Sequence, residues 1–106
     1  MSDLRLVLST APDADTAAAL ARAMVRARLA ACVNIVPAVR SVYVWDGELA
    51  DEQEVLLVIK STRGQLGRLQ EWLEAQHPYA VPELVALEPA QVSSAYARWI
   101  TDHVVD

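Results

Sequence analysis

The sequence predicts an α+β fold of the ferredoxin-like type, a split β-α-β sandwich with helices on one face of an antiparallel sheet. Two short segments with alternating hydrophobic residues flank segments with helical spacing. Between them lies a β-rich stretch of about thirty residues interrupted by Asp46-Gly47, a strong hairpin signal. The predicted order is β-α-β-β-α-β-α, and its first six elements form the split unit. The seventh is an extra C-terminal helix.

Composition limits the classes of protein that fit. The 106 residues, 54% of them hydrophobic, match one domain, which we expect to cover 1–106. A net charge of −5 argues against nucleic acid and anionic membrane surfaces as partners. The N-terminus lacks the apolar region of a secretory signal, and no apolar run reaches the roughly 18 residues of a membrane span. We therefore expect a cytoplasmic protein.

The first strand and helix follow from local patterns. Alternation predicts a strand over Leu4–Thr10, which Pro12 ends because proline cannot continue a ladder. Helical spacing predicts a helix from about Asp15 to Ala31. Asp13 or Asp15 is a suitable N-cap, because a carboxylate accepts hydrogen bonds from the first free amides.

The long hairpin is the most β-like part of the chain. Gly47 accepts the positive φ that a primed turn requires, and Pro37 predicts an edge position or a bulge in the first arm. Arms of this length exceed a typical strand pair, so the hairpin should project and expose open edges. A partner subunit is the expected cover for these edges. The sheet face without helices needs the same cover, or the last helix.

The rest of the chain supplies two helices and a strand. Thr62–Gln65 fits a capping box, and the helix that follows should end before Pro78. Glu83–Glu88 is a predicted short strand. Ser93 or Ser94 can cap the last helix.

Three groups of residues are candidates for chemistry. His77 lies with Tyr79 and Glu83 between two prolines, and it can be a metal ligand, a general base or simply a helix C-cap. Cys32 can be a soft-metal ligand or a buried small hydrophobe, and one cysteine alone makes no zinc or copper site. The acidic run 46–54 lacks the spacing of a calcium loop, which favours a solvated hairpin tip. Signatures of common enzyme families are missing.

Five motifs together resemble the CutA family of divalent-cation tolerance proteins, in order, from about Leu4 to His103. They are "ARLAACVNIVP", "SVYVWDGEL", "EVLLVIKST", "HPYAVPEL" and "YARWI". The resemblance implies a homotrimer with PII-like architecture, tolerance of copper and other divalent cations, no catalytic reaction and no organic cofactor.

The resemblance also suggests site residues. His77, in the matching "HPY", is the best metal-ligand candidate, and Cys32 is a weaker one. Ser9 and Gln76 stand where some members have cysteine and histidine, and both bind copper less well. The family motifs also suggest an intersubunit pocket lined by Trp45, Glu54, Lys60, Tyr79 and Glu83.

Three functions follow from these residues. The leading hypothesis is a trimeric metal-tolerance protein that binds Cu²⁺ or another divalent cation through His77 and nearby oxygens. The second is a PII-like signalling trimer whose cleft binds a small anionic ligand with Lys60 and Arg63, beside a helix N-terminus. The third, a small cofactor-free enzyme with His77 as base and Glu83 orienting it, is the weakest, because no nucleophile accompanies the base.

Overall fold

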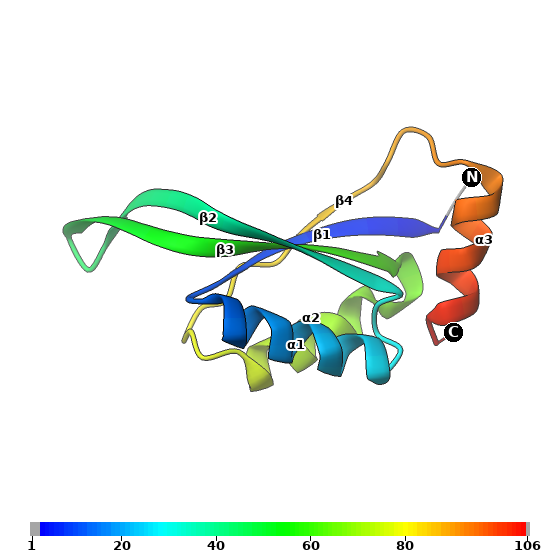
Figure 1. Ribbon diagram of the computed structural model, residues 1–106, viewed down its shortest axis with the longest axis horizontal. Helices are drawn as coiled ribbons and strands as arrows, with labels where there is room; N and C mark the ends of the chain where they lie inside the picture. Colours follow the sequence, from blue (N-terminus) through cyan, green and yellow to red (C-terminus); the bar gives the residue numbers. More distant parts are fainter. Residues whose placement is uncertain (1–2, 106) are drawn as a thin grey trace.

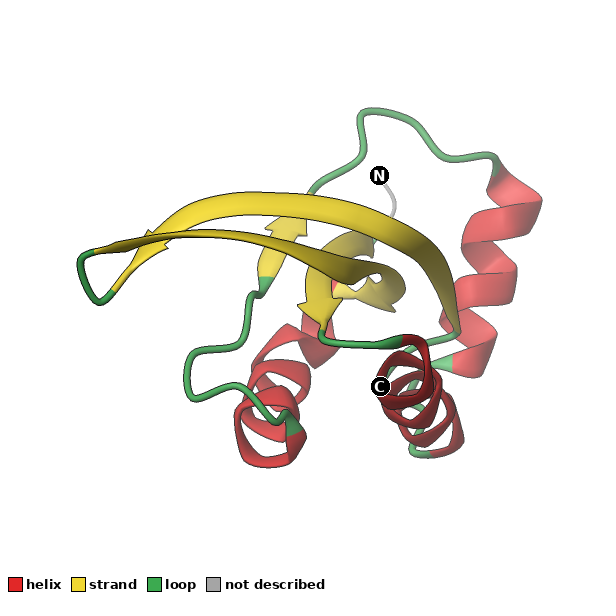
Figure 2. Cartoon of the chain, turned by 60° about the vertical axis from the view of Figure 1, so that its left-hand side comes forward, coloured by secondary structure: helices red, strands yellow, loops and turns green. Residues whose placement is uncertain are grey.

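The computed structural model describes residues 3–105 and confirms the predicted α+β class and element order (Figure 1). All strand pairs are antiparallel, and the sheet order is β2-β3-β1-β4. Helices α1 and α2 lie on one face of this sheet, and α3 lies at one end of it (Figures 1 and 2). In chain order the elements are β1 (Leu4–Ala11), α1 (Ala14–Arg26), β2 (Cys32–Trp45), β3 (Glu48–Thr62), the 3₁₀ turn η1 (Arg63–Gln65), α2 (Leu66–Gln76), β4 (Val85–Leu87) and α3 (Ser94–His103).

The main core lies between the helices and one face of the two central strands. Alternate residues of β1 and β3, including Val7, Leu57 and Ile59, are fully buried there against Met24 of α1 and Leu73 of α2. Burial of each such side chain stabilises the fold by about 1.5–3 kcal/mol. The two-residue period of the strands therefore fixes which face receives the helices.

Helix α1 begins as predicted but ends earlier. Asp13 is the N-cap, and its side chain accepts the Thr16 amide at 2.7 Å. The helix stops at Arg26 and not at Ala31, because Arg28 adopts a left-handed φ of 59°. The amides of Arg28 and Leu29 donate to the carbonyls of Val25 and Met24, each at 3.0 Å, which is a Schellman motif. After this turn the side chain of Leu29 is buried in the main core.

The hairpin confirms both expectations attached to Pro37. Strand β2 is an edge strand, and its register with β3 shifts between Val36 and Val39, so a bulge lies at Pro37-Ala38. Asp46 and Gly47 have φ values of 52° and 77°, as a primed turn requires. The arms extend well beyond the helical layer (Figure 1), and the molecule is 44 Å long.

The capping box predicted at Thr62–Gln65 is wrong. Thr62 makes no side-chain cap bond, and a 3₁₀ turn precedes α2. Gln65 turns inward instead, where its buried amide donates to the Val105 carbonyl and ties down the C-terminal tail. The later elements are close to expectation: α2 ends at Gln76, and β4 is shorter than the predicted Glu83–Glu88. Ser93 occupies the N-cap of α3 without a side-chain bond.

The second face of the sheet is apolar and largely open. It carries Leu6 and Leu8 of β1, which the register places opposite Leu87 and Val85 of β4. Both β4 residues are exposed. Helix α3 covers this face at one end, where Ile100 packs in a small cluster with Leu4. The predicted need for a further cover therefore remains.

Among residues 3–105, no helix combines the length and the apolar composition that crossing a bilayer requires.

Candidate functional site

The loop after α2 is fixed to the end of β1 by His77. Its Nε2 lies 2.7 Å from the Thr10 carbonyl oxygen, and the Tyr79 amide donates to its Nδ1 at 3.0 Å. An Nδ1 that accepts a hydrogen bond assigns the proton to Nε2, which then donates to Thr10. His77 is 7% exposed. A metal ion can therefore bind its imidazole after one of these two hydrogen bonds opens.

Tyr79 joins this loop to β3. Its hydroxyl donates to Oε2 of Glu54 at 2.7 Å, and its ring packs against His77 with centroids 4.7 Å apart. Glu54 is only 7% exposed. Burial, and then the hydrogen bond and the negative charge of Glu54, raise the pKa of Tyr79 above its usual value. The phenol therefore stays protonated and keeps its donor role near neutral pH.

A second tyrosine–carboxylate pair lies beside the first. The Tyr43 hydroxyl donates to Oε2 of Glu52 at 3.2 Å. Tyr43 and Tyr79 line the same cavity. After burial and Glu54, the negative charge of Glu52 also helps to raise the pKa of Tyr79. The site thus combines two phenols with two carboxylates.

Tyr43, Glu54 and Tyr79 line a cavity of about 560 Å³, here called the Glu54 cleft. Its walls are formed by the hairpin, by the end of β1 and by the loop after α2. The charged side chains among its described lining residues are Glu54 and Glu83, both carboxylates. Most of its other described lining residues are aromatic or apolar. The described lining residues are Thr10, Tyr43, Trp45, Glu54, Pro78, Tyr79, Ala80, Val81, Pro82 and Glu83.

The structure brings together four of the five residues predicted for the pocket: Trp45, Glu54, Tyr79 and Glu83 all line the cleft. Lys60 does not. Its ammonium group lies 5.7 Å from the ring centroid of Tyr96, on α3. Arg63, the other cation invoked for an anionic ligand, is the first residue of η1 and is also absent from the described lining of the cleft.

Cys32 and His77 are not brought together within one chain. Cys32 is the first residue of β2 and is paired with Lys60 of β3, which in turn is paired with Leu6 of β1. His77 contacts β1 at Thr10, four residues further along, or about 13 Å at the rise of a strand. Across residues 3–105, no group of three or more His, Cys, Asp or Glu side chains is arranged to hold a metal ion.

The acidic run of the hairpin divides into residues with separate partners. Asp51 forms two 2.7 Å hydrogen bonds with Arg40, whereas Glu52 accepts from Tyr43. The tip is exposed as expected. For Glu54, however, a solvated position was the wrong expectation, because the Tyr79 loop covers it.

Sequence reasoning did not single out Tyr43 as a site residue. A signal was available in the two-residue turn, which sets the register Trp45↔Glu48, Tyr43↔Ala50 and Ser41↔Glu52. Residues that share a face across this ladder alternate along each arm. The turn therefore places Tyr43, Trp45 and Glu52 on one face.

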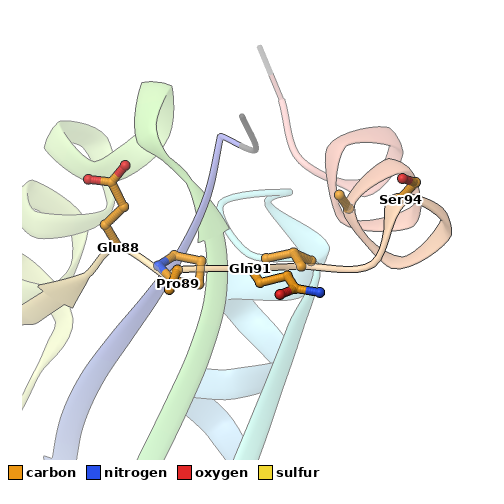
Figure 3. A pocket seen from close by; sticks show the side chains of 7 residues that line it. Glu88, Pro89, Gln91 and Ser94 are labelled. Carbon is orange, nitrogen blue, oxygen red and sulfur yellow. The ribbon is translucent and has the colours of Figure 1, made fainter.

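A second hollow, of about 460 Å³, lies along the segment between β4 and α3 (Figure 3). Glu88, Pro89, Gln91 and Ser94 are among its lining residues. The carboxylate of Glu88 and the amide of Gln91 point in different directions (Figure 3). Glu88 also lies 3.7 Å from Arg5 in an ion pair. The Glu54 cleft, which brings two carboxylates and three aromatic rings to one cavity, is therefore the better candidate site.

Comparison with known proteins places this architecture in one family. The family model described as CutA1 divalent ion tolerance protein matches residues 5–103. A Thermus thermophilus protein named divalent-cation tolerance protein CutA is 45% identical over 98 residues, which are 92% of this chain and 95% of that protein. The structure of CutA from Synechococcus elongatus superposes with a TM-score of 0.94 at 45% identity, covering 99% of this chain and 93% of that one.

Family members differ in length and location. An Arabidopsis thaliana relative named Protein CutA, chloroplastic, is 41% identical over 90% of this chain. This chain spans 52% of the length of that relative. Family resemblance therefore does not fix the compartment. The matched span and the fold agree, and the chain belongs to the CutA1 divalent ion tolerance protein family.

Proposed function

We propose that this protein acts in divalent-cation tolerance as a cytoplasmic homotrimer and binds cations in the Glu54 cleft. The observation that carries the proposal is the sign of the cleft's charge, since both of its charged described lining residues are carboxylates. The Tyr79 hydrogen bond fixes the orientation of one of them. Carboxylate oxygens suit Mg²⁺, Ca²⁺ and Mn²⁺, and the name of the Thermus relative refers to divalent cations.

Copper adds a requirement. Cu²⁺ favours imidazole over oxygen donors alone. His77 directly precedes Pro78, which lines the cleft. We propose that Cu²⁺ recruits His77 by displacing the Tyr79 amide from Nδ1. Harder cations would bind to Glu54 and Glu83 without this step. Cys32 lies too far along the sheet to join His77 in the same subunit.

The trimer is supported by the apolar surface that one chain leaves open. Leu87 and Val85 on the open face are exposed, as are Val42, Val44 and Leu49 on the projecting hairpin. Exposed apolar side chains that are grouped on a surface mark contacts between proteins. Packing of three copies would cover both regions.

The alternative functions fit the site less well. A small anionic ligand would meet the carboxylates of Glu54 and Glu83 in the cleft, whereas Lys60 and Arg63 are both absent from its described lining. A general base needs a free nitrogen, whereas Nδ1 of His77 already accepts a hydrogen bond. We therefore propose a binding protein and not an enzyme.

Calorimetric titration of Mn²⁺ into the metal-free protein tests the proposal. We expect saturable binding that weakens at least tenfold in Glu54→Gln, which keeps an acceptor for Tyr79 and removes the charge. Glu71→Gln is the matched control, because Glu71 is an exposed carboxylate on α2, outside the cleft. Equal Mn²⁺ affinity in wild type and Glu54→Gln, or no saturable binding at all, would refute cation binding at this site.

A further inference from the structure

The three aromatic rings of the Glu54 cleft have no part in the proposed binding of a divalent ion. A hard metal ion takes oxygen ligands and has no use for ring faces. Tyr43, Trp45 and Tyr79 nevertheless line the same cavity as the carboxylates of Glu54 and Glu83. We propose that the cleft is also a site for an organic ammonium ion. This inference rests on the proposed function in one respect, that the cleft attracts cations.

Rings and carboxylates together select this class of ligand. The face of an aromatic ring carries partial negative charge and attracts ammonium groups within about 6 Å of its centroid. The contact is stronger where water is excluded, and aromatic cages for quaternary ammonium groups work in this way. The carboxylates of Glu54 and Glu83 add negative charge to the lining of the same cavity. An anion of equal size would be repelled by both features.

The ring of Tyr79 is held in place before any ligand arrives. The Tyr79 amide donates a hydrogen bond to His77, its hydroxyl donates one to Glu54, and its ring packs on the imidazole. Pro78 and Pro82 restrict the backbone on either side. A wall that is already ordered loses little entropy when a ligand binds, so the affinity of the site is not reduced by loop ordering.

The size of the cleft agrees with an organic cation. A volume of about 560 Å³ lies within the range of about 300–1,000 Å³ of small-molecule sites. A dehydrated metal ion would fill a small part of it. Val81, Pro82 and Ala80 add apolar surface, which suits the methyl or methylene groups that surround an ammonium nitrogen.

The test compares choline with its neutral isostere 3,3-dimethylbutan-1-ol, each titrated calorimetrically into the assembled protein at constant ionic strength. We expect saturable choline binding and at least tenfold weaker binding of the isostere. Trp45→Leu should weaken choline binding about 3- to 30-fold, the range set by one cation–π contact. Trp99→Leu, which removes an exposed tryptophan on α3, should leave choline affinity unchanged.

Two results would overturn the inference. Equal binding of choline and the isostere would mean an apolar pocket without cation selectivity. No saturable binding of either, as when a side chain of a neighbouring subunit fills the cleft, would mean that no ammonium site is open. Mn²⁺ titration of the same samples separates the two proposals. Mn²⁺ binding without choline binding refutes this inference alone, and choline binding without Mn²⁺ binding refutes the divalent-cation site alone.

Discussion

The hydroxyl of Tyr79 donates a 2.7 Å hydrogen bond to Oε2 of Glu54, and this bond connects the loop after α2 to strand β3. Glu54 would otherwise be a carboxylate with 7% exposure in a wall of rings and prolines. Burial of a charge without a partner is unfavourable, so the two residues depend on each other. The loop, the hairpin and the cleft between them thus form one unit.

Removal of this hydroxyl should destabilise the protein. Tyr79→Phe leaves the buried Glu54 without its donor, which we expect to lower the free energy of unfolding by about 1–3 kcal/mol. Tyr96→Phe is the matched control, because Tyr96 lies exposed on α3. Urea unfolding of both variants measures the difference. An identical midpoint for Tyr79→Phe and wild type would show that the bond contributes nothing to stability.

The same residue predicts how stability changes at high pH. The folded state raises the pKa of Tyr79, mainly by burial and then by Glu54. The folded protein therefore holds this proton more tightly than the unfolded chain, whose tyrosines titrate near about 10. The resulting stability is complete below about pH 10 and is lost as the pH rises above it.

We therefore expect the free energy of unfolding to fall more steeply above about pH 10 in wild type than in Tyr79→Phe. Urea titrations at a series of pH values from neutral to alkaline measure both slopes. Below about pH 9 the difference between the two proteins should be constant. Parallel curves throughout would contradict a raised pKa for Tyr79.

Loss of His77 should affect the binding of Cu²⁺ and of Mn²⁺ differently. Since Cu²⁺ prefers imidazole and Mn²⁺ prefers carboxylates, His77→Ala should abolish Cu²⁺ binding and retain most Mn²⁺ binding. His103→Ala is the control, because His103 lies exposed at the end of α3. Calorimetry with each ion measures both. Unchanged Cu²⁺ binding in His77→Ala would remove His77 from the metal site, and loss of both ions would assign it to positioning the loop.

Periodicity and turn chemistry were sufficient to predict the element order, the hairpin turn and the bulge at Pro37. Each of these follows from local sequence: side-chain alternation, the positive φ of Gly47 and the missing amide of proline. The early end of α1 does not, because Arg28 adopts a left-handed conformation that residue type does not favour. Tertiary contacts hold Arg28 in place, including the hydrogen bond that the Val105 amide donates to its carbonyl oxygen.

The candidate site was predictable in its members more than in its geometry. Glu54 and Tyr79 were both expected near a pocket, yet their hydrogen bond joins residues far apart in sequence. Lys60 was expected in the same pocket and lies elsewhere. Glu54 and Lys60 are at different points along β3, and Lys60 lies beside Tyr96 of α3. Sequence motifs identify such residues, whereas only the fold decides which of them meet.

Ala38 offers a test of the strained backbone at the bulge. It has a φ of 61° without being glycine, and its side chain is exposed. Ala38→Gly should relieve this conformation and raise the free energy of unfolding by about 0.5–1 kcal/mol. Ala23→Gly, at an exposed position inside α1, should have the opposite effect and lower it by about 1 kcal/mol. Thermal unfolding of both variants measures these two changes in stability. Destabilisation by Ala38→Gly would contradict strain at the bulge.

The open face of the sheet predicts which contacts would hold the proposed trimer together. Val85 of β4 and Val25 of α1 are similarly exposed in one chain, at 46% and 40%. Val85 lies on the open face, whereas α1 lies on the other face of the sheet (Figure 1). A glutamate at either position should therefore cost the single chain little. At an apolar contact between subunits, however, Val85→Glu would bury an unpaired charge and favour dissociation.

We expect wild type and Val25→Glu to have a solution mass of three times 11.6 kDa, and Val85→Glu to dissociate. Analytical ultracentrifugation measures the mass. Because assembly is linked to folding, the thermal midpoint of wild type should rise with protein concentration. A monomeric wild type would rule out the trimer. A trimer that survives Val85→Glu would place the subunit contacts elsewhere, with the exposed side chains of the projecting hairpin, Val42, Val44 and Leu49, as the remaining apolar surface.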